Sequence, residues 1–221
     1  MPVRPLSSGL LRSNMNRRIP RLLEKAEAQK HSGSGESTVT SESRSFPTAA
    51  EADGFFDELR QELFCVREWN RKTALTSFEL FDEEGNLADR QTAVVGDFIR
   101  LMMTGSGKYD WVRIIEIVNE AGEAIVTIKP SPDPTDKEPD KNVTSHFFTS
   151  DATNNFCLEK RDAVVSFYVI GLSEKTNTDE TESLVGKARN VAVANIGSYF
   201  GIQTGEWKTF CKNLLRLTDQ E

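Results

Sequence analysis

The middle of the sequence is a succession of runs in which apolar and polar residues alternate, and turns, not helices, separate these runs. Residues 110–118 and 123–130 alternate in this way on either side of a polar turn at 119–122, which is typical of a β-hairpin. Residues 155–162 and 163–174 form a second, tightly joined pair. Strands that follow one another so closely pair antiparallel, so the sequence predicts an antiparallel sheet, either open or a partial barrel.

Further alternating runs extend this sheet to about six strands. They cover residues 73–91, which turn at Gly85, together with 92–103 and 142–148. The stretch TGSGK at 104–108 is similar to the end of a phosphate-binding loop. Tyr109 follows its lysine where a magnesium-binding hydroxyl is needed, however, and the next residues form a strand instead of a helix. We therefore predict a hairpin turn at 104–108.

Helical periodicity flanks the predicted strands on both sides. Residues 49–64 form the N-terminal helix, because Thr48 and Glu51 have capping-box spacing and apolar residues recur every three or four positions. Two C-terminal helices are predicted, one over 184–202 and one that starts near 205. The expected architecture is a single acidic α+β domain over residues 47–221, with all three helices packed on the sheet.

Residues 1–46 are expected to lie outside that domain as a basic, flexible arm and a Ser/Gly-rich linker. Residues 1–30 carry seven Lys and Arg but two Asp and Glu, a charge of +5, which leaves −12 for the remaining chain. Residues 31–45 have almost no apolar side chains to bury. The arm could contact an acidic protein or an anionic surface. Its many arginines also allow organelle import as an alternative to a cytoplasmic location.

The predicted helix over 184–202 has the most informative side-chain pattern. A stripe of Gly186, Asn190, Gly197 and Gly201 would let a strand, a helix or a partner chain approach closely. Trp207 is expected to anchor the next helix in the core or at a partner interface. Arg189 falls inside the apolar arc, so its guanidinium must reach a carboxylate, a carbonyl or solvent, or else bind an anionic ligand. The candidate ligand-binding residues are Arg189, Asn195, His146 and Tyr168.

No catalytic or metal-binding pattern can be written from this sequence. It has only two histidines, His31 and His146, and three widely spaced cysteines, which we expect to be reduced and partly buried. No stretch approaches the about 18 apolar residues of a membrane-spanning helix. The acidic body argues against specific nucleic-acid binding. We therefore expect neither a cofactor nor a metal.

The composition and patterns favour a non-enzymatic intracellular binding or adaptor protein, chaperone-like in kind, that recruits a protein partner. The alternative is a small-ligand-binding or enzymatic α+β domain with a pocket between the sheet and the helix over 184–202. An interior filled by phenylalanine side chains would count against this alternative.

Overall fold

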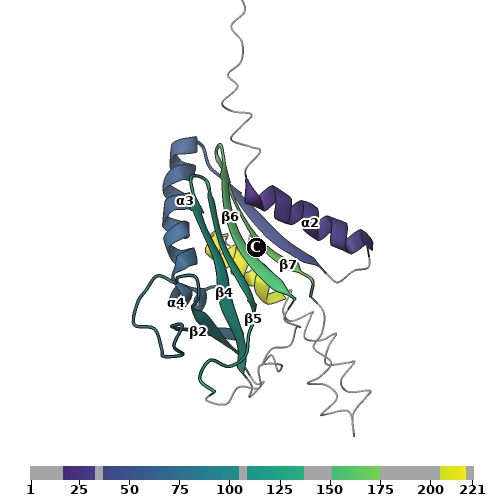
Figure 1. Cartoon of the computed structure of the whole chain (residues 1–221). Helices are drawn as coiled ribbons and strands as arrows, with labels where there is room; N and C mark the ends of the chain where they lie inside the picture. The colour runs from purple at the N-terminus through teal and green to yellow at the C-terminus, as the bar shows by residue number, and fades with distance from the viewer. Residues whose placement is uncertain (1–16, 33–36, 105–108, 137–150, 175–204, 218–221) are drawn as a thin grey trace, which may run out of the picture.

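The computed structural model describes residues 17–32, 37–104, 109–136, 151–174 and 205–217, which form an α+β fold around one curled antiparallel sheet (Figure 1). The strand order across the described sheet is β1-β7-β6-β5-β4-β3-β2. The strands are β1 (Thr38–Ser45), β2 (Thr76–Phe81), β3 (Phe98–Met103), β4 (Tyr109–Glu120), β5 (Glu123–Pro130), β6 (Thr153–Arg161) and β7 (Val164–Leu172). The predicted fold class is confirmed, and the described part of the sheet has seven strands where about six were expected.

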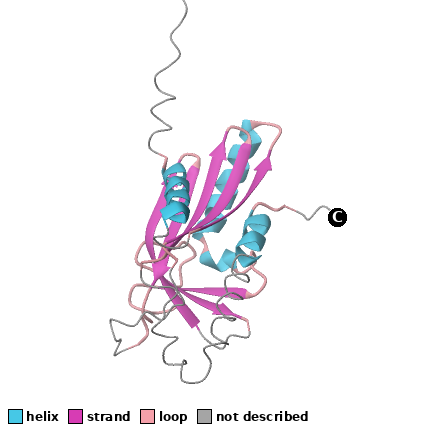
Figure 2. Cartoon of the chain, turned by 90° about the vertical axis from the view of Figure 1, so that its right-hand side faces the viewer, coloured by secondary structure: helices cyan, strands magenta, loops and turns pink. Residues whose placement is uncertain are grey.

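Helices cover both faces of this sheet. They are α2 (Arg18–Ser32), α3 (Ala49–Phe64), the short α4 (Val66–Trp69) and a C-terminal helix over residues 205–214. We call the face that carries α2 the outer face, and the face that carries α3 and the C-terminal helix the inner face (Figure 2). The predicted helix over 184–202, the predicted strand over 142–148 and residues 105–108 of the predicted turn lie outside the described residues.

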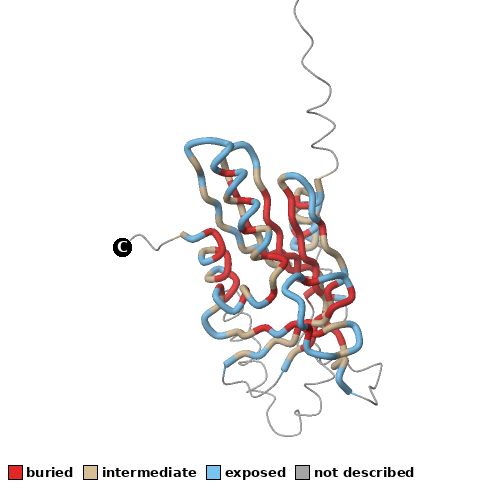
Figure 3. The backbone as a smooth tube through the Cα atoms, turned by 90° about the vertical axis from the view of Figure 1, so that its left-hand side faces the viewer, coloured by how far each residue is buried: buried red, intermediate tan, exposed pale blue. Residues whose placement is uncertain are grey.

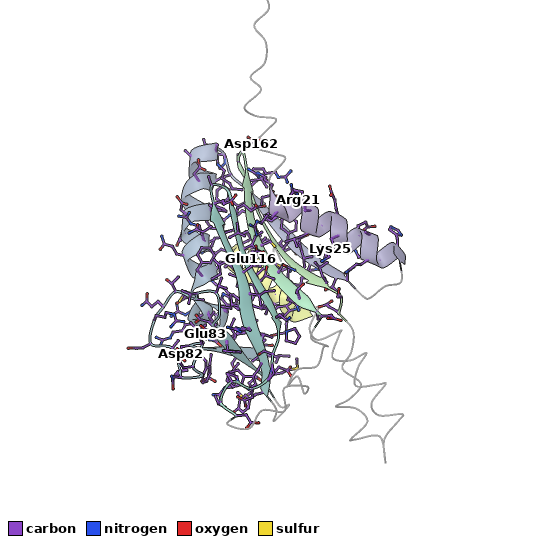
Figure 4. All side chains as sticks on the ribbon, viewed as in Figure 1. Arg21, Lys25, Asp82, Glu83, Glu116 and Asp162 are labelled. Atoms are coloured by element: carbon purple, nitrogen blue, oxygen red, sulfur yellow. The ribbon has the colours of Figure 1, made fainter. Side chains whose placement is uncertain are left out.

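The two predicted hairpins are confirmed. β4 pairs with β5 around a turn in which Gly122 has φ +76°, a conformation that L side chains rarely adopt. β6 pairs with β7 around Asp162, which lies at the exposed tip of the hairpin and has φ +50° (Figure 4). Aspartate tolerates this left-handed conformation better than most residues. Both hairpins therefore follow from local turn chemistry.

Helix α3 begins and ends at the predicted residues, Ala49 and Phe64. Thr48 caps its first turn: the backbone N–H of Glu51 donates to Thr48 Oγ1 over 3.2 Å, and Thr48 Oγ1 donates to the Glu51 carboxylate over 2.9 Å. The buried side of the helix consists of Ala52, Phe56, Leu59, Leu63 and Phe64. This apolar stripe fixes α3 to the inner face of β5, β6 and β7.

The main core lies between the inner face and its helices, and Figure 3 shows buried segments running through the sheet and along the C-terminal helix. Trp69 is at its centre, with its ring centroid 4.7 Å from that of Phe156 and 5.7 Å from that of Phe210. Trp69 Nε1 donates to the backbone oxygen of Leu63 over 2.9 Å, so its polar atom is satisfied. The C-terminal helix contributes Trp207, Phe210, Cys211, Leu214 and Leu215 to this core.

The expected flexible linker over 31–45 is wrong where β1 lies, at 38–45. β1 is the edge strand beside β7, and its backbone hydrogen bonds to β7 stabilise it without requiring apolar side chains. Residues 18–32 of the expected arm also form a helix, α2. Pro20 does not prevent this helix, because it lies in the first turn, where backbone N–H groups have no helical acceptor.

Helix α2 packs on the outer face through a second apolar cluster. Its Ile19 and Ala26 are fully buried against Val118, Ile125 and Ile170 of the sheet. The Glu123 carboxylate caps the helix N-terminus, because it accepts from the backbone N–H groups of Arg18 and Ile19 over 3.0 and 2.8 Å. Among the described helices, none is long and apolar enough to span a membrane.

Candidate functional site

Most of the predicted site residues lie outside the part of the chain that the structure describes. Of the candidate ligand-binding residues, His146, Arg189 and Asn195 lie outside the described residues, as do the interface residues Gly186, Asn190, Gly197 and Gly201. Tyr168 is on the outer face of β7, where it packs against the cluster beneath α2. Burial raises the pKa of its phenol, and the nearby Glu159 carboxylate acts in the same direction.

Trp207 packs in the main core. Core packing is one of the two roles predicted for it, and a partner interface is the other. Its ring centroid lies 5.3 Å from that of Phe156 and 6.3 Å from that of Phe210. Phe210 in turn stacks on Phe167 at 5.6 Å. Aromatic rings thus occupy the space between the inner face and the C-terminal helix, and this filling weighs against a ligand-sized pocket beneath that helix.

A small cleft does open where the inner face meets the start of the C-terminal helix. Leu101, Asp110, Val112, Asn154 and Trp207 are among the residues that line it, and its volume is about 40 Å³. Asn154 Oδ1 and Trp207 Nε1 are buried and have no hydrogen-bond partner among the described residues. This volume suits a water molecule or one small polar group, and it is far below the roughly 300–1,000 Å³ of typical ligand pockets.

The cysteines do not form a reactive or metal-binding site in the part of the chain that the structure describes. Cys65, Cys157 and Cys211 are free thiols, as predicted, with Cys157 and Cys211 buried. Burial raises the pKa of Cys157 well above its ordinary value and that of Cys211 to about 12. Among the described residues, no cluster of three or more His, Cys, Asp or Glu side chains could hold a metal ion.

The two edge strands of the described sheet differ in whether side chains bond to their outward backbone groups, and β2 is the protected edge. Asn70 covers Phe78: its Oδ1 accepts from the Phe78 N–H over 2.8 Å, and its Nδ2 donates to the Phe78 oxygen over 2.9 Å. Glu206 Oε2 accepts from the Thr76 N–H, and Thr73 Oγ1 donates to the Thr76 oxygen. The backbone groups of β2 that face away from β3 are therefore largely occupied, which blocks the addition of another strand.

In the part of the chain that the structure describes, β1 is the open edge. Phe46 N donates to the Ala163 oxygen over 2.8 Å. In an antiparallel pair every second residue directs its backbone N–H and C=O toward the neighbouring strand, so those of residues 38, 40, 42 and 44 point toward β7. Those of Val39, Ser41, Ser43 and Ser45 point away from it. None of the hydrogen bonds made by the described residues reaches these outward groups.

The side chains of β1 fall into two rows. Val39, Ser41, Ser43 and Ser45 are exposed, and Ser43 Oγ lies 2.8 Å from Ser166 Oγ. On the inner side, Arg44 Nη1 donates to the backbone oxygen of Leu215 over 3.2 Å, and its guanidinium lies 4.9 Å from the Phe55 ring centroid. Glu42 is a half-buried neighbour in the same row. The edge thus offers backbone groups flanked by serines on one side and by an acid and a base on the other.

This candidate site was missed from the sequence for a definite reason. The strand TVTSESRS contains one apolar residue, Val39, so it shows none of the alternation of apolar and polar residues that marks a half-buried strand. Serine and glycine also precede it in the sequence, which is typical of a linker. A weaker signal was present, because Thr, Glu and Arg alternate with Ser along its length.

Comparisons with known proteins support the fold only. No family model and no curated protein matches this sequence. A hypothetical protein of Helicobacter pylori is similar in structure, with a TM-score of 0.52 at 8% identity over 84% of this chain and 89% of that one. The di-domain ARO/CYC protein BexL gives a TM-score of 0.41 at 11% identity, over 96% of this chain and 59% of the other. Norcoclaurine synthase from Thalictrum flavum gives 0.38 at 9% identity, over 85% and 97%.

Proposed function

We propose that this protein is a non-enzymatic binding or adaptor protein that recruits a protein partner by adding an extended segment of that partner to β1. The observation that carries the proposal is the contrast between the edges. Side chains occupy the outward backbone groups of β2, whereas those of Val39, Ser41, Ser43 and Ser45 have no partner among the described residues. Strand addition uses such an edge directly, because the backbone supplies the hydrogen bonds.

The chemistry of β1 indicates what kind of segment would fit. The exposed serines are small, so they neither obstruct a second strand nor form deep side-chain pockets. Glu42 and Arg44 lie two residues apart on the inner side, and they favour a segment that presents a base and an acid at the same spacing. A chaperone-like role would use the same edge.

The basic arm and the intracellular setting remain part of this proposal. Arg17 and Arg18 are ion-paired with Glu159 and Glu116 of the sheet, so they hold α2 in place (Figure 4 labels Glu116). Fewer of the basic residues in 1–30 are then available to attract an acidic partner. The free thiols of Cys65, Cys157 and Cys211 suit a reducing compartment such as the cytoplasm.

The proposal is tested by a proline at the edge. Ser43→Pro removes an outward N–H and leaves the backbone hydrogen bonds to β7 in place, so the strand should persist while strand addition is blocked. Affinity capture from cells, with quantitative mass spectrometry, should lose specific partners with Ser43→Pro and keep them with Ser43→Ala. Circular dichroism and thermal unfolding should show both variants folded. Identical partner sets from the two variants would rule out the β1 edge as the binding site.

A further inference from the structure

We infer that the segment that adds to β1 is β1 of a second copy of this chain, paired antiparallel about a two-fold axis at Ser43. The inference rests on the proposed function, because it takes β1 as a strand-accepting edge and names the occupant. A two-fold dimer places the same strand on both sides of the interface, so the strand must be complementary to itself. The residues around Ser43 meet this requirement.

The direction of the backbone groups limits the ways in which two copies can pair. Val39, Ser41, Ser43 and Ser45 carry the outward groups, so hydrogen-bonded pairs can form only among these residues of the two copies. The two-fold axis can therefore pass through any residue from 41 to 44. Each of these four positions is a different register, in which different residues of the two copies face each other. Charge decides among these four registers.

Only the register centred on Ser43 brings opposite charges together. It places Glu42 opposite Arg44 of the second copy, and the symmetry repeats this pair on the other side of the axis. An axis at Glu42 or at Arg44 instead places that residue opposite its own copy, so two like charges meet. An axis at Ser41 places neither Glu42 nor Arg44 opposite a residue of the other charge. Glu42 and Arg44 share the inner side of β1, so the paired side chains lie on one face.

The remaining contacts fit the same register. Ser41 faces Ser45 of the second copy and Ser43 faces Ser43, so only small exposed side chains meet on the outer side. Val39 faces Pro47, whose missing N–H ends the ladder there. Arg44 keeps donors for a carboxylate, because its bonds to the Leu215 and Arg216 oxygens use Nη1 alone.

The dimer should be weak and dependent on concentration. One added strand pair buries less surface than the roughly 1,200–2,000 Å² of standard stable interfaces, so we expect a dissociation constant above about 1 µM. The charged pairs lie near the surface, and higher salt should weaken the dimer further. Sedimentation velocity of the full chain over a range of concentrations, up to about 1 mM, measures this constant.

Charge reversal identifies the register. Glu42→Arg places two arginines opposite each other on both sides of the axis, and Arg44→Glu does the same with two glutamates. Each variant alone should therefore dimerise at least about tenfold more weakly than wild type. An equimolar mixture of the two variants restores opposite charges at both positions and should regain dimerisation within about threefold of wild type. Ser43→Pro should stay monomeric, and Ser43→Ala should dimerise normally.

Two results would overturn the inference. A wild-type chain that stays monomeric at every concentration would exclude the second copy as occupant, while the capture experiment with Ser43→Pro still tests strand addition. A dimer that Ser43→Pro and Glu42→Arg leave unchanged would place the interface elsewhere. Arg44 also contacts the C-terminal helix, so thermal unfolding must first show that Arg44→Glu folds. If it does not fold, the dissociation constants of Glu42→Arg and Glu42→Gln test the register. Only the arginine adds a like charge opposite Arg44, so Glu42→Arg should dimerise more weakly than Glu42→Gln.

Discussion

At the scale of single residues, Gly85 shows how one backbone angle fixes a loop. Its φ is +81°, and a Cβ added there would lie 2.7 Å from the backbone oxygen of Pro134, which cannot rotate away. The turn after β2 and the segment after β5 thus approach each other closely at this glycine. Asp82 stabilises the same turn by accepting from the Asn86 N–H over 2.7 Å, which lowers the pKa of its carboxyl.

Gly85→Ala should therefore destabilise the protein by about 2 kcal/mol, because the new side chain adds both backbone strain and a clash. Gly54→Ala is the matched control. Gly54 is an exposed residue of α3 with no atom within 4 Å of an added Cβ, so alanine there should stabilise by about 0.5–1 kcal/mol. Urea unfolding of both variants measures these changes. Equal changes in the free energy of unfolding, with the same sign in Gly85→Ala and Gly54→Ala, would show that Gly85 is not under a special backbone constraint.

At the scale of elements, α2 is held to the outer face by contacts at its two ends as well as by its apolar side. Glu123 caps the helix start, Arg17 pairs with Glu159 at 3.3 Å, and Gln29 exchanges hydrogen bonds with Ser173 near the other end. Glu123 and Glu159 are direct cross-strand neighbours and are both buried. Two adjacent carboxylates repel each other. The cap stabilises Glu123, and ion pairs with Arg17 and Arg161 stabilise Glu159.

Glu123→Gln should loosen α2 selectively. Losing a charged acceptor of two backbone N–H groups costs about 1.5 kcal/mol or more, which corresponds to about tenfold faster amide exchange along the helix. Glu116→Gln removes only the half-exposed partner of Arg18 and should change exchange little. Hydrogen exchange followed by NMR or mass spectrometry compares the two variants. Unchanged exchange in Glu123→Gln would show that the apolar contacts alone hold α2.

At the scale of the whole molecule, the buried thiols couple stability to alkaline pH. Burial raises the pKa of Cys211 to about 12 and that of Cys157 well above its ordinary value, so both thiols bind their protons more tightly when folded. Their contribution to stability is complete below the unfolded pKa, about 8.5, and is lost as the pH rises toward the folded values. The protein should therefore lose stability between about pH 9 and 12, which urea unfolding across this range measures.

Thiol labelling checks the same assignment at pH 8. We expect one fast-reacting thiol, Cys65, and two thiols that react only in urea, because the thiolate is the reactive form and both Cys157 and Cys211 are buried. Cys65→Ser should remove the fast phase. Three thiols that react at similar rates in the native protein would contradict the burial of Cys157 and Cys211.

The parts of the fold that local rules specify were predictable. The cap at Thr48 lies within a few residues of the apolar stripe of α3. The turns at Gly122 and Asp162 likewise lie next to the strands that each of them joins. Each of these features therefore leaves a complete pattern in a short segment. β1 and α2 leave no such pattern. The acceptor that caps α2 is Glu123, about a hundred residues away, and the strand that pairs with β1 is β7. Neither partner can be identified by examining a short window.

Local patterns were thus enough to predict the α+β class, the antiparallel hairpins, the bounds of α3 and the free thiols, because these depend on periodicity, turn residues and spacing. Long-range contacts determine that a Ser/Thr-rich segment becomes a strand. They also make β1 the open edge among the described residues, while Asn70 and Glu206 protect β2. A strand at the edge of a sheet is stabilised by backbone hydrogen bonds to its neighbour. These bonds depend on where that neighbour lies in space, and the side chains of the strand do not record it.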